Sequence, residues 1–481
     1  MNFQIIRYML GYVCFFQTAF LSLPFLVACI YREMHVGMAY LGTMGLCALL
    51  GIFLTWKKPA DKRMYSKEGL VTVSLSWIVL SITGAIPFTV AGEMPNYVDA
   101  LFETVSGFTT TGSTILTDVD AISYASRFWR SFTHWVGGMG VLVFILAILP
   151  LKGGAFMNLM KAESPGPSVS KLVPKLRDTA VYLYAIYMGM TLVQLFILLL
   201  TGMPIFDAVT ITLGTAGTGG FSVRSSGMDD YTVLQQGIIA VFMILFGVNF
   251  NVYFLMVKKK PKQALKSEEV WAYFGIIAAA VAIITISLRS SFGNIFEAFH
   301  HAFFQVGSVI TTTGYATVDF NYWPPIARTV LVILMFVGAC AGSTGGGIKV
   351  SRIVIMVKGI TKEIQTLLHP RSVKKVRMDG RTVEHEVVRS VNVYLAIYIL
   401  IFVGSLLLIT LDEKDLVTNF TAVTTTLNNI GPGLEIVGPM GNFSSFSNLS
   451  KLVFCLNMLA GRLELLPMLM LFVPSVWKKK G

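Results

Sequence analysis

Two short stretches, TTTGS at residues 109–113 and TTTGY at residues 311–315, decide the fold of this chain. Both place polar, glycine-broken backbone in a sequence that is otherwise strongly apolar. Of its 481 residues, 54% are hydrophobic and 13% are charged, against about 25% charged in an average soluble domain. Irregular backbone at membrane depth is tolerated only where protein buries it or where it lines a water-filled cavity. The recurrence therefore predicts a repeated unit around such a cavity.

Apolar windows of about twenty residues, the length that crosses a hydrocarbon core of roughly 30 Å, recur along the whole sequence. We expect ten membrane-spanning segments, which puts both termini on one side. The first is longer than the apolar core of a signal peptide, about 7 to 15 residues, so we expect it to be retained. The ten segments are expected at 5–30, 36–56, 68–91, 128–150, 179–202, 234–257, 270–289, 326–358, 388–411 and 451–476.

The formal net charge of +12 is distributed unevenly. Basic residues gather in alternate loops, whereas the loops between them lean acidic. The positive-inside rule assigns the basic loops and both termini to the cytoplasm, so the charge indicates a membrane surface rather than a nucleic-acid partner. An acidic outer face would also concentrate cations, unless its charges are merely solvated. The basic clusters lie at 57–67, 152–177, 258–266, 358–389 and 478–480.

A segment too short and too polar to cross the membrane follows the third, fifth, seventh and ninth expected spans. These segments read DALFETVSGFTTTGSTIL from Asp99, DAVTITLGTAGTGGFSV from Asp207, HAFFQVGSVITTTGYATVDF from His301 and NFTAVTTTLNNIGPGLE from Asn419. In the first three, an alanine precedes a glycine by the same interval: Ala100 and Gly112, Ala208 and Gly220, Ala302 and Gly314. The fourth keeps the threonine-rich run but not the alanine.

The predicted fold is an all-α polytopic membrane protein with four pseudo-symmetric span, pore-loop, span repeats around a central pore. Two additional transmembrane helices precede the repeats, at residues 1–60. The repeats are expected at 61–155, 156–262, 263–360 and 361–481, and the second helix of the third repeat is expected to be broken.

Further motifs, together with these repeats, indicate a known family. They are FWRSFTHWVGGMGVLV from Phe128, AGSTGGGIKVSR from Ala341, LNNIGPGLE from Leu427 and AGRLELLPMLMLF from Ala460. On these residues the chain resembles the Trk/Ktr/HKT superfamily of potassium transporters, and within it the TrkH-type membrane subunit of bacterial Trk uptake systems. The resemblance covers nearly the whole chain, including the two extra N-terminal spans.

The resemblance implies a selectivity filter with one glycine from each repeat, and glycine in all four is the potassium-selective pattern. Carbonyl oxygens just before each glycine would replace the hydration shell of the ion. In the second repeat we choose Gly220 over Gly219, because its spacing from Ala208 matches the other repeats. The expected potassium-binding residues are Thr110, Thr111, Gly112, Thr218, Gly219, Gly220, Thr312, Thr313, Gly314, Asn429, Ile430 and Gly431.

The stretch AGSTGGGIK at residues 341–349 interrupts the eighth expected span. Each glycine costs a helix roughly 1 kcal/mol relative to alanine, so a continuous helix is not expected. A phosphate-binding loop is not indicated either, because Ile348 separates the last glycine from Lys349. The resemblance implies a gating loop beneath the filter; a simple kink is the alternative. The expected gating residues here are Gly342, Gly345, Gly346, Gly347 and Lys349.

Arg462 lies deep in the last expected span. An unpaired charge near the bilayer centre costs at least about 2.5–3.5 kcal/mol, so its side chain should face protein or water. Glu464 is two residues away and does not share its helix face. The resemblance implies that Arg462 projects towards the permeation path and takes part in gating; a structural or snorkelling arginine is the alternative.

Sequence and resemblance together predict channel-like potassium uptake across a bacterial inner membrane, driven by about 2.3 kcal/mol per charge for each 100 mV. The resemblance also implies a homodimer of pores in the lipid bilayer, controlled by a cytoplasmic nucleotide-binding subunit of the TrkA type. No organic cofactor is expected, only the transported potassium ion.

A proton- or sodium-coupled symporter on the same scaffold is the alternative function. It would require a titratable or second-ion site in the path, and the four filter segments contain no carboxylate. An intramembrane enzyme is a remote alternative. HEVVR at residues 385–389 lacks the second histidine of a zinc-binding H-E-x-x-H motif, and the five cysteines are irregularly spaced within the expected spans.

Overall fold

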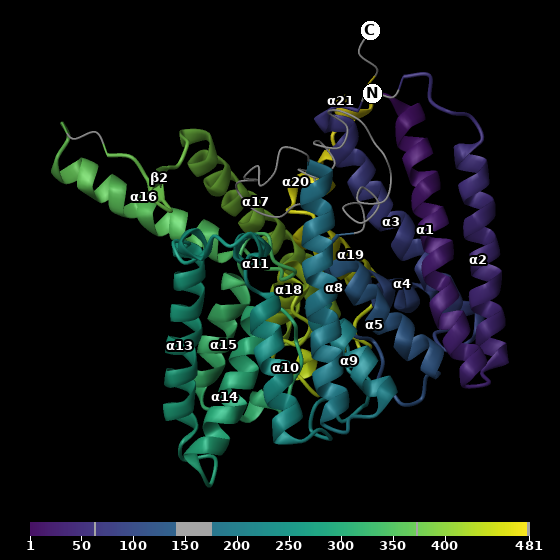
Figure 1. Ribbon diagram of the computed structural model, residues 1–481, viewed down its shortest axis with the longest axis horizontal. Helices are drawn as coiled ribbons and strands as arrows, with labels where there is room; N and C mark the ends of the chain where they lie inside the picture. The colour runs from purple at the N-terminus through teal and green to yellow at the C-terminus, as the bar shows by residue number, and fades with distance from the viewer. Residues whose placement is uncertain (62–63, 141–175, 372–373, 479–481) are drawn as a thin grey trace.

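The computed structural model describes residues 1–61, 64–140, 176–371 and 374–478. It is built almost wholly of helices (Figure 1). An N-terminal hairpin of α1 (Phe3–Ile30) and α2 (Met34–Thr55) lies at one side of the bundle and packs on α3 and α5. A two-stranded hairpin, β1 (Arg377–Met378) and β2 (Arg381–Thr382), lies in the long connector before α17.

The same succession of three helices then recurs four times along the chain. Each unit begins with a long apolar helix: α3 (Ser66–Val90), α8 (Leu176–Leu200), α13 (Glu268–Leu288) and α17 (His385–Ile409). A short pore helix follows: α4 (Tyr97–Phe108), α9 (Ile205–Gly217), α14 (Ile295–Ile310) and α18 (Leu416–Asn428). The unit closes with a helix of intermediate length: α5 (Tyr124–Gly138), α10 (Val233–Phe246), α15 (Pro325–Val337) and α19 (Asn448–Arg462).

This order is the predicted architecture of four repeats after a helical hairpin. The exact boundaries between repeats stay predictions. The expected boundary at residues 155 and 156 and most of the basic loop at 152–177 lie outside the described residues.

The closing helix of each unit ends before the span that the sequence predicts for it. The expected span at 234–257 is broken rather than continuous, since α10 and α11 (Phe250–Val257) meet at a bend of 88°. The expected span at 451–476 is also interrupted: α19 ends at Arg462, and α20 (Leu466–Met470) follows after Leu465, which has a left-handed φ of 63°.

The other two closing helices also end early. The break after α15 is the one the glycines predict, and α16 (Val350–Leu368) begins beyond it and runs sideways out of the bundle (Figure 1). The expected span at 128–150 is α5 up to Gly138, and its part beyond residue 140 lies outside the described residues.

Six described helices are long and apolar enough to cross a membrane, namely α1, α2, α3, α8, α13 and α17, and the bent pair α10 and α11 makes a seventh. The remaining three of the ten expected spans are the ones that begin with α5, α15 and α19. The molecule is therefore a multi-pass membrane protein whose continuous spans surround interrupted ones.

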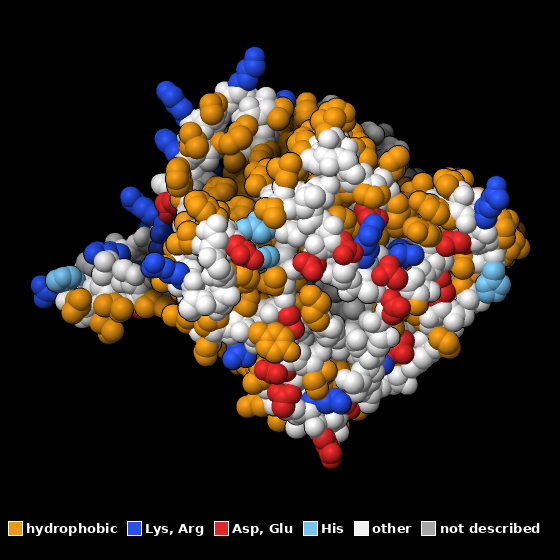
Figure 2. Space-filling view, turned by 90° about the horizontal axis from the view of Figure 1, so that it is seen from below, with side chains coloured by type: hydrophobic (Ala, Val, Ile, Leu, Met, Phe, Trp, Pro, Cys, Tyr) orange, Lys and Arg blue, Asp and Glu red, His pale blue; other side chains and the backbone are white. Residues whose placement is uncertain are grey.

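The two ends of the chain lie at the same end of the molecule, as an even number of crossings requires. Figure 1 shows α21 (Pro474–Trp477) next to the N-terminus, and the rings of Phe3 and Trp477 stack with centroids 6.4 Å apart. Figure 2 looks onto the opposite end, where Asp and Glu side chains gather over the middle of the face.

Candidate functional site

The backbone takes the same unusual path after each of the four pore helices. We call the predicted filter glycine of each repeat its key glycine. The residue two positions before each key glycine has a left-handed φ, and so does the key glycine itself, but the residue between them does not. The first set is Thr110, Thr218, Thr312 and Asn429, with φ of 56°, 54°, 59° and 57°. The second set is Gly112, Gly220, Gly314 and Gly431, with φ of 80°, 79°, 90° and 102°. Because only glycine adopts the larger positive angles freely, this pattern aligns the four segments and selects Gly220 rather than Gly219.

The residue between the two left-handed positions turns its amide back into its own pore helix. Each of these amides donates to a carbonyl five residues earlier: Thr111 to Ser106 (2.9 Å), Gly219 to Gly214 (2.9 Å), Thr313 to Ser308 (2.9 Å) and Ile430 to Thr425 (3.0 Å). Such bonds cap a helix that ends in a left-handed residue. The amides are thereby engaged, and the carbonyls of the same residues point away from the helix.

These four carbonyls form a closed ring with the key glycines. A methyl group placed on a key glycine would lie against the carbonyl oxygen of the next segment: Gly112 on Gly219 at 2.1 Å, Gly220 on Thr313 at 1.8 Å, Gly314 on Ile430 at 2.1 Å and Gly431 on Thr111 at 2.9 Å. The fourth contact returns to the first repeat. The structure thus brings all twelve predicted filter residues together, and any side chain in place of the hydrogen would displace a carbonyl.

The threonine hydroxyls of the first and third segments bond behind the ring. Thr111 Oγ1 lies 2.8 Å from Thr109 Oγ1, and Thr313 Oγ1 lies 2.7 Å from Thr311 Oγ1. In the fourth segment, Asn429 Nδ2 donates to Thr111 Oγ1 at 2.9 Å, which joins the last repeat to the first. These bonds engage side-chain groups with one another and take up none of the four ring carbonyls.

His134 on α5 connects two filter segments and was missed by the sequence reasoning. Its fully buried ring places Nδ1 2.8 Å from the carbonyl oxygen of Gly107, while Nε2 accepts a hydrogen bond from the amide of Phe221 at 3.2 Å. Gly107 is in the first pore helix and Phe221 directly follows the second key glycine. The imidazole therefore fixes the spacing between the first two quarters of the ring.

A buried ion pair lies on the same face of α5, one turn earlier. Arg130 donates to Glu103 at 2.7 Å and to the carbonyl oxygen of Ser222 at 3.1 Å. Glu103 in turn accepts from the amide of Ile115 at 3.0 Å. A signal for both residues was present in FWRSFTHW, because Arg130 and His134 are four residues apart in an apolar segment and so share a helix face.

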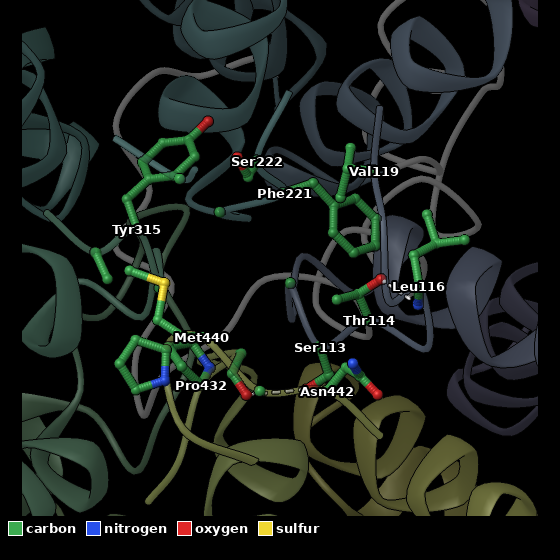
Figure 3. Close-up of a pocket in the computed structure, with 18 of the residues that line it drawn as sticks. Ser113, Thr114, Leu116, Val119, Phe221, Ser222, Tyr315, Pro432, Met440 and Asn442 are labelled. Carbon is green, nitrogen blue, oxygen red and sulfur yellow. Dashed lines mark hydrogen bonds between the residues drawn. The ribbon is translucent and has the colours of Figure 1, made fainter. Parts of the chain in front are cut away.

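A cavity of about 120 Å³ opens above the ring and is lined by all four repeats. The residue that follows each key glycine lies at its wall: Ser113, Phe221, Tyr315 and Pro432. Figure 3 shows these side chains around an open centre, with ribbons of the four repeats behind them. Asp118 lies in the chain between two lining residues, Thr117 and Val119. The hydrogen bond from Ser225 Oγ at 2.6 Å and that from the Asp120 amide lower the pKa of Asp118, which favours its anionic form.

Beneath the ring, the interrupted helix of the third repeat supplies a loop that contacts the filter from the other side. The amide of Gly346 donates to Thr312 Oγ1 at 2.6 Å, and the amide of Gly347 donates to the carbonyl of Asn428 at 3.0 Å. Lys349 Nζ donates to the carbonyl of Gly345. The predicted gating residues Gly345, Gly346 and Gly347 therefore lie against the end of the pore helices and the predicted filter, and Lys349 binds Gly345, whereas Gly342 lies at the bend between α10 and α11.

Arg462 binds this loop and the first repeat together. Its guanidinium donates to the carbonyl oxygens of Thr344 at 2.7 Å, Gly137 at 2.5 Å and Gly138 at 2.7 Å. Glu464 pairs instead with Arg352 of α16. The structure thus places Arg462 under the ring, at the end of α19, where it faces backbone carbonyls rather than lipid.

Glu269, in the first turn of α13, was also missed. Its buried carboxylate accepts from the amide of Ala341 at 2.6 Å, from the amide of Ser351 at 3.2 Å and from Asn249 Nδ2 at 3.4 Å. The first two amides flank the loop at either end. Glu269 therefore fixes both ends of the loop, and its sequence signal was weak because a glutamate at a helix start is common.

Four pore helices that end at a closed ring of backbone carbonyls are suited to one task, since carbonyls can replace the water around a dehydrated cation. In the described residues no group of three or more His, Cys, Asp and Glu side chains could hold a metal ion. Fold and site together define a class: multi-pass cation-transport proteins with a central pore.

The comparisons with known proteins identify the family within this class. A family model described as TrkH, a cation transport protein, matches residues 37–479, and the chain belongs to this family. It is 36% identical over 490 residues to the Trk system potassium uptake protein TrkH of Salmonella typhimurium, with both chains covered completely. It is 31% identical over 481 residues to the Trk system potassium uptake protein TrkG of Escherichia coli K12, with 99% of each covered.

A solved structure is similar over the same length. The crystal structure of the potassium transporter TrkH from Vibrio parahaemolyticus superimposes with a TM-score of 0.89 at 31% identity, and covers 99% of this chain and 100% of that one. The predicted family and the all-α membrane fold are therefore confirmed.

Proposed function

We propose that this chain carries potassium ions into a bacterial cell through its central pore by a channel-like mechanism. The observation that carries the proposal is the closed ring of four carbonyls, from Thr111, Gly219, Thr313 and Ile430. It is supported by the relatives, which are named potassium uptake proteins.

Two electrostatic features favour a cation at the ring. All four pore helices direct their C-terminal ends at it, and each such end carries a partial negative charge of about one half. On the outer side, the first pore-loop connection presents ionised Asp118 at the rim of the cavity. Both features attract a cation, and the ring itself has no carboxylate that would hold the ion tightly.

The contacts of a buried carboxylate near the filter favour passive flow over obligatory coupling to protons or sodium ions. Glu103 lies behind the first filter segment, but Arg130 and the Ile115 amide engage it. Its oxygens are thus engaged by protein groups, and none of the twelve filter residues has a carboxylate that could take up a coupled proton or sodium ion. The bacterial membrane potential then supplies the driving force.

We further propose that the loop at residues 338–349 and Arg462 form the gate. The loop lies under the ring in contact with Thr312 and Asn428. A guanidinium beneath the filter opposes cation passage by charge repulsion. Opening would require Arg462 to release the carbonyls of Thr344, Gly137 and Gly138.

We propose that two such pores assemble as a homodimer in the inner membrane, with both termini in the cytoplasm, and that a nucleotide-binding subunit of the TrkA type docks on the cytoplasmic side. The basic residues of the connectors, such as Lys258 and Lys358, support this orientation. The relatives are named as proteins of a Trk system, which supports a multi-subunit assembly.

Flux through purified protein in sealed vesicles tests the function. With a potassium gradient alone, and no proton or sodium gradient, we expect flux that rises with an inside-negative potential. Flux that appears only when a proton or sodium gradient is imposed would show obligatory coupling and overturn the channel-like mechanism.

A further inference from the structure

An outward-facing groove of about 620 Å³ lies between α8, α10 and α11, beside the 88° bend. Figure 1 shows α8 running alongside α10 and α11. Its walls are apolar and include Ile186, Gly189, Met190, Phe242, Leu245 and Tyr253. Because these helices belong to the membrane-spanning part of the chain, the groove faces the acyl chains of the bilayer.

The groove exists because two local features withhold side chains from it. Gly189 contributes no side chain, and a methyl group built on it meets nothing within 4 Å. The bend at residues 247–249 carries α11 away from the line of α10. The hydroxyl of Tyr253 donates to the carbonyl of Leu245 at 2.7 Å, which satisfies its polar atom inside the bend. The walls therefore offer apolar surface to a ligand.

One end of the groove is basic. Lys258 Nζ lies 4.5 Å from the ring centroid of Tyr182 and 3.4 Å from its hydroxyl, so it joins α11 to α8 at the mouth. Lys259 and Lys260 follow directly and are exposed. Basic pockets beside transmembrane helices at the cytoplasmic surface bind anionic lipid headgroups. The charge at the mouth thus fits a phosphate at the end of an acyl chain.

We propose that this groove binds an anionic glycerophospholipid, with an acyl chain along Gly189 and Phe242 and its headgroup phosphate at Lys258. The apolar walls and the basic mouth each match one part of that molecule. A zwitterionic lipid would match the walls but not the charge.

The bound lipid bears on the gate, and this second part rests on the gating function proposed above. The bend hydrogen-bonds to the loop: the Cys340 amide donates to Gly247 at 3.1 Å, and the Phe250 amide donates to Gly342 at 3.0 Å. Thr344 Oγ1 donates to the carbonyl of Phe246 at 3.2 Å. A lipid packed on Leu245 and Tyr253 supports the bend that holds the loop.

Lipid binding is tested on the purified, delipidated full chain by titration with phosphatidylglycerol or phosphatidylcholine, followed by native mass spectrometry. Gly189→Leu fills the groove without a clash, and we expect it to lower the affinity for phosphatidylglycerol by about tenfold or more. Gly45→Leu is the matched control, since Gly45 lies in α2 with equally open space around it. Lys258→Gln should reduce the preference for phosphatidylglycerol by about fivefold.

Binding of phosphatidylglycerol to Gly189→Leu with the affinity of the unaltered chain would overturn the site. Equal binding of the two lipids by the unaltered chain would overturn the assigned headgroup. Thermal unfolding is measured on both leucine variants as a control that each is folded.

The effect on the gate is tested by potassium flux in vesicles of phosphatidylcholine with and without phosphatidylglycerol. We expect the anionic lipid to change the flux of the unaltered chain and of Gly45→Leu severalfold, and to leave Gly189→Leu unaffected. An equal response of Gly189→Leu would overturn the coupling while leaving the binding result intact. Absence of flux from the unaltered chain in every vesicle would contradict the proposed function instead. The binding assay measures lipid affinity separately, so the two failures can be told apart.

Discussion

Replacing each key glycine with alanine, one at a time, tests whether the four carbonyls are the ion-facing atoms. A real Cβ essentially never comes within 3.0 Å of a backbone oxygen, and the built contacts differ between the repeats. At Gly220 the contact is 1.8 Å, so the Thr313 carbonyl must retreat by 1.2 Å to reach 3.0 Å. At Gly112 and Gly314 the contact of 2.1 Å requires 0.9 Å, and at Gly431 the contact of 2.9 Å requires 0.1 Å.

Two effects of these substitutions can be separated. All four place a side chain at a positive φ, which costs on the order of 1–3 kcal/mol of folding stability each. Displacement of the ion-facing oxygen, in contrast, is graded, and it is the displacement that decides selectivity. We therefore expect comparable losses in stability but unequal losses in the preference for potassium over sodium.

The assay is the ratio of potassium to sodium flux in vesicles, with thermal unfolding measured on the same preparations. Gly220→Ala should lose at least about tenfold in the ratio, equivalent to roughly 1.4 kcal/mol, and Gly431→Ala should lose the least. Gly237→Ala is the control, because that glycine lies on α10 with nothing within 4 Å. A folded Gly220→Ala with undiminished preference, or equal losses at Gly220 and Gly431, would refute the ring as the selective element.

Three further substitutions test the surroundings of the ring. Arg462→Gln removes the cation beneath the filter, so basal potassium flux should rise severalfold in vesicles; flux at the level of the unaltered chain would contradict its role in the gate. Glu269→Gln keeps one acceptor oxygen but loses the negative charge that binds the amides at the two ends of the loop. It should lower the free energy of unfolding by about 1–3 kcal/mol and raise basal flux. An unchanged free energy of unfolding would show that the loop does not depend on the Glu269 carboxylate. His134→Phe fills the same space but leaves the buried Phe221 amide without a partner, at about 1–3 kcal/mol, while the Gly107 carbonyl keeps its bond from the Thr110 amide at 3.1 Å; a thermal unfolding midpoint equal to that of the unaltered chain would argue against the link between the first two repeats.

The sequence carried enough information for the membrane class, the order of the helices and the position of the four segments that meet in the ring. Polar glycine-bearing segments stand out against an apolar background, and their spacing from the preceding alanine aligned three of the four. The fourth could be aligned only by resemblance, because Asn429 stands where Thr110, Thr218 and Thr312 stand. Backbone conformation is what the four share, and asparagine tolerates the left-handed region better than most residues.

The interruptions of the closing helices were harder to predict. The third repeat signals its break with three consecutive glycines, and α5 of the first repeat ends on the pair Gly137 and Gly138. The bend at residues 247–249 carries one glycine in an apolar run, and the break after Arg462 falls at Leu463, Glu464 and Leu465, which are ordinary helix formers. Tertiary contacts override that preference, since Arg462 reaches the Thr344 carbonyl and Glu464 pairs with Arg352. The partners of His134, Arg130 and Glu269 are likewise distant in sequence, so the sequence could mark these residues but not the contacts that they make.

The unequal lengths of the breaks explain why one repeat supplies the loop that we propose as the gate. Twelve residues separate α15 from α16, whereas three separate α10 from α11 and three separate α19 from α20. Only the third break, of these three, has enough chain to form a loop under the ring. The other repeats supply its anchors: the carbonyls of Gly137 and Gly138, the bend at residues 247–249, and Arg462.

Because anchors from three repeats hold one loop, release of a single contact leaves the others in place. Hydrogen bonds of this kind contribute about 0.5–1.5 kcal/mol each, and more when one partner is charged. A ligand or partner that opens the pore must therefore bind the open form more tightly by the sum of several such contacts. That requirement favours control through a movement of α16 or of the bend, each of which shifts several contacts at once, over control at any single side chain.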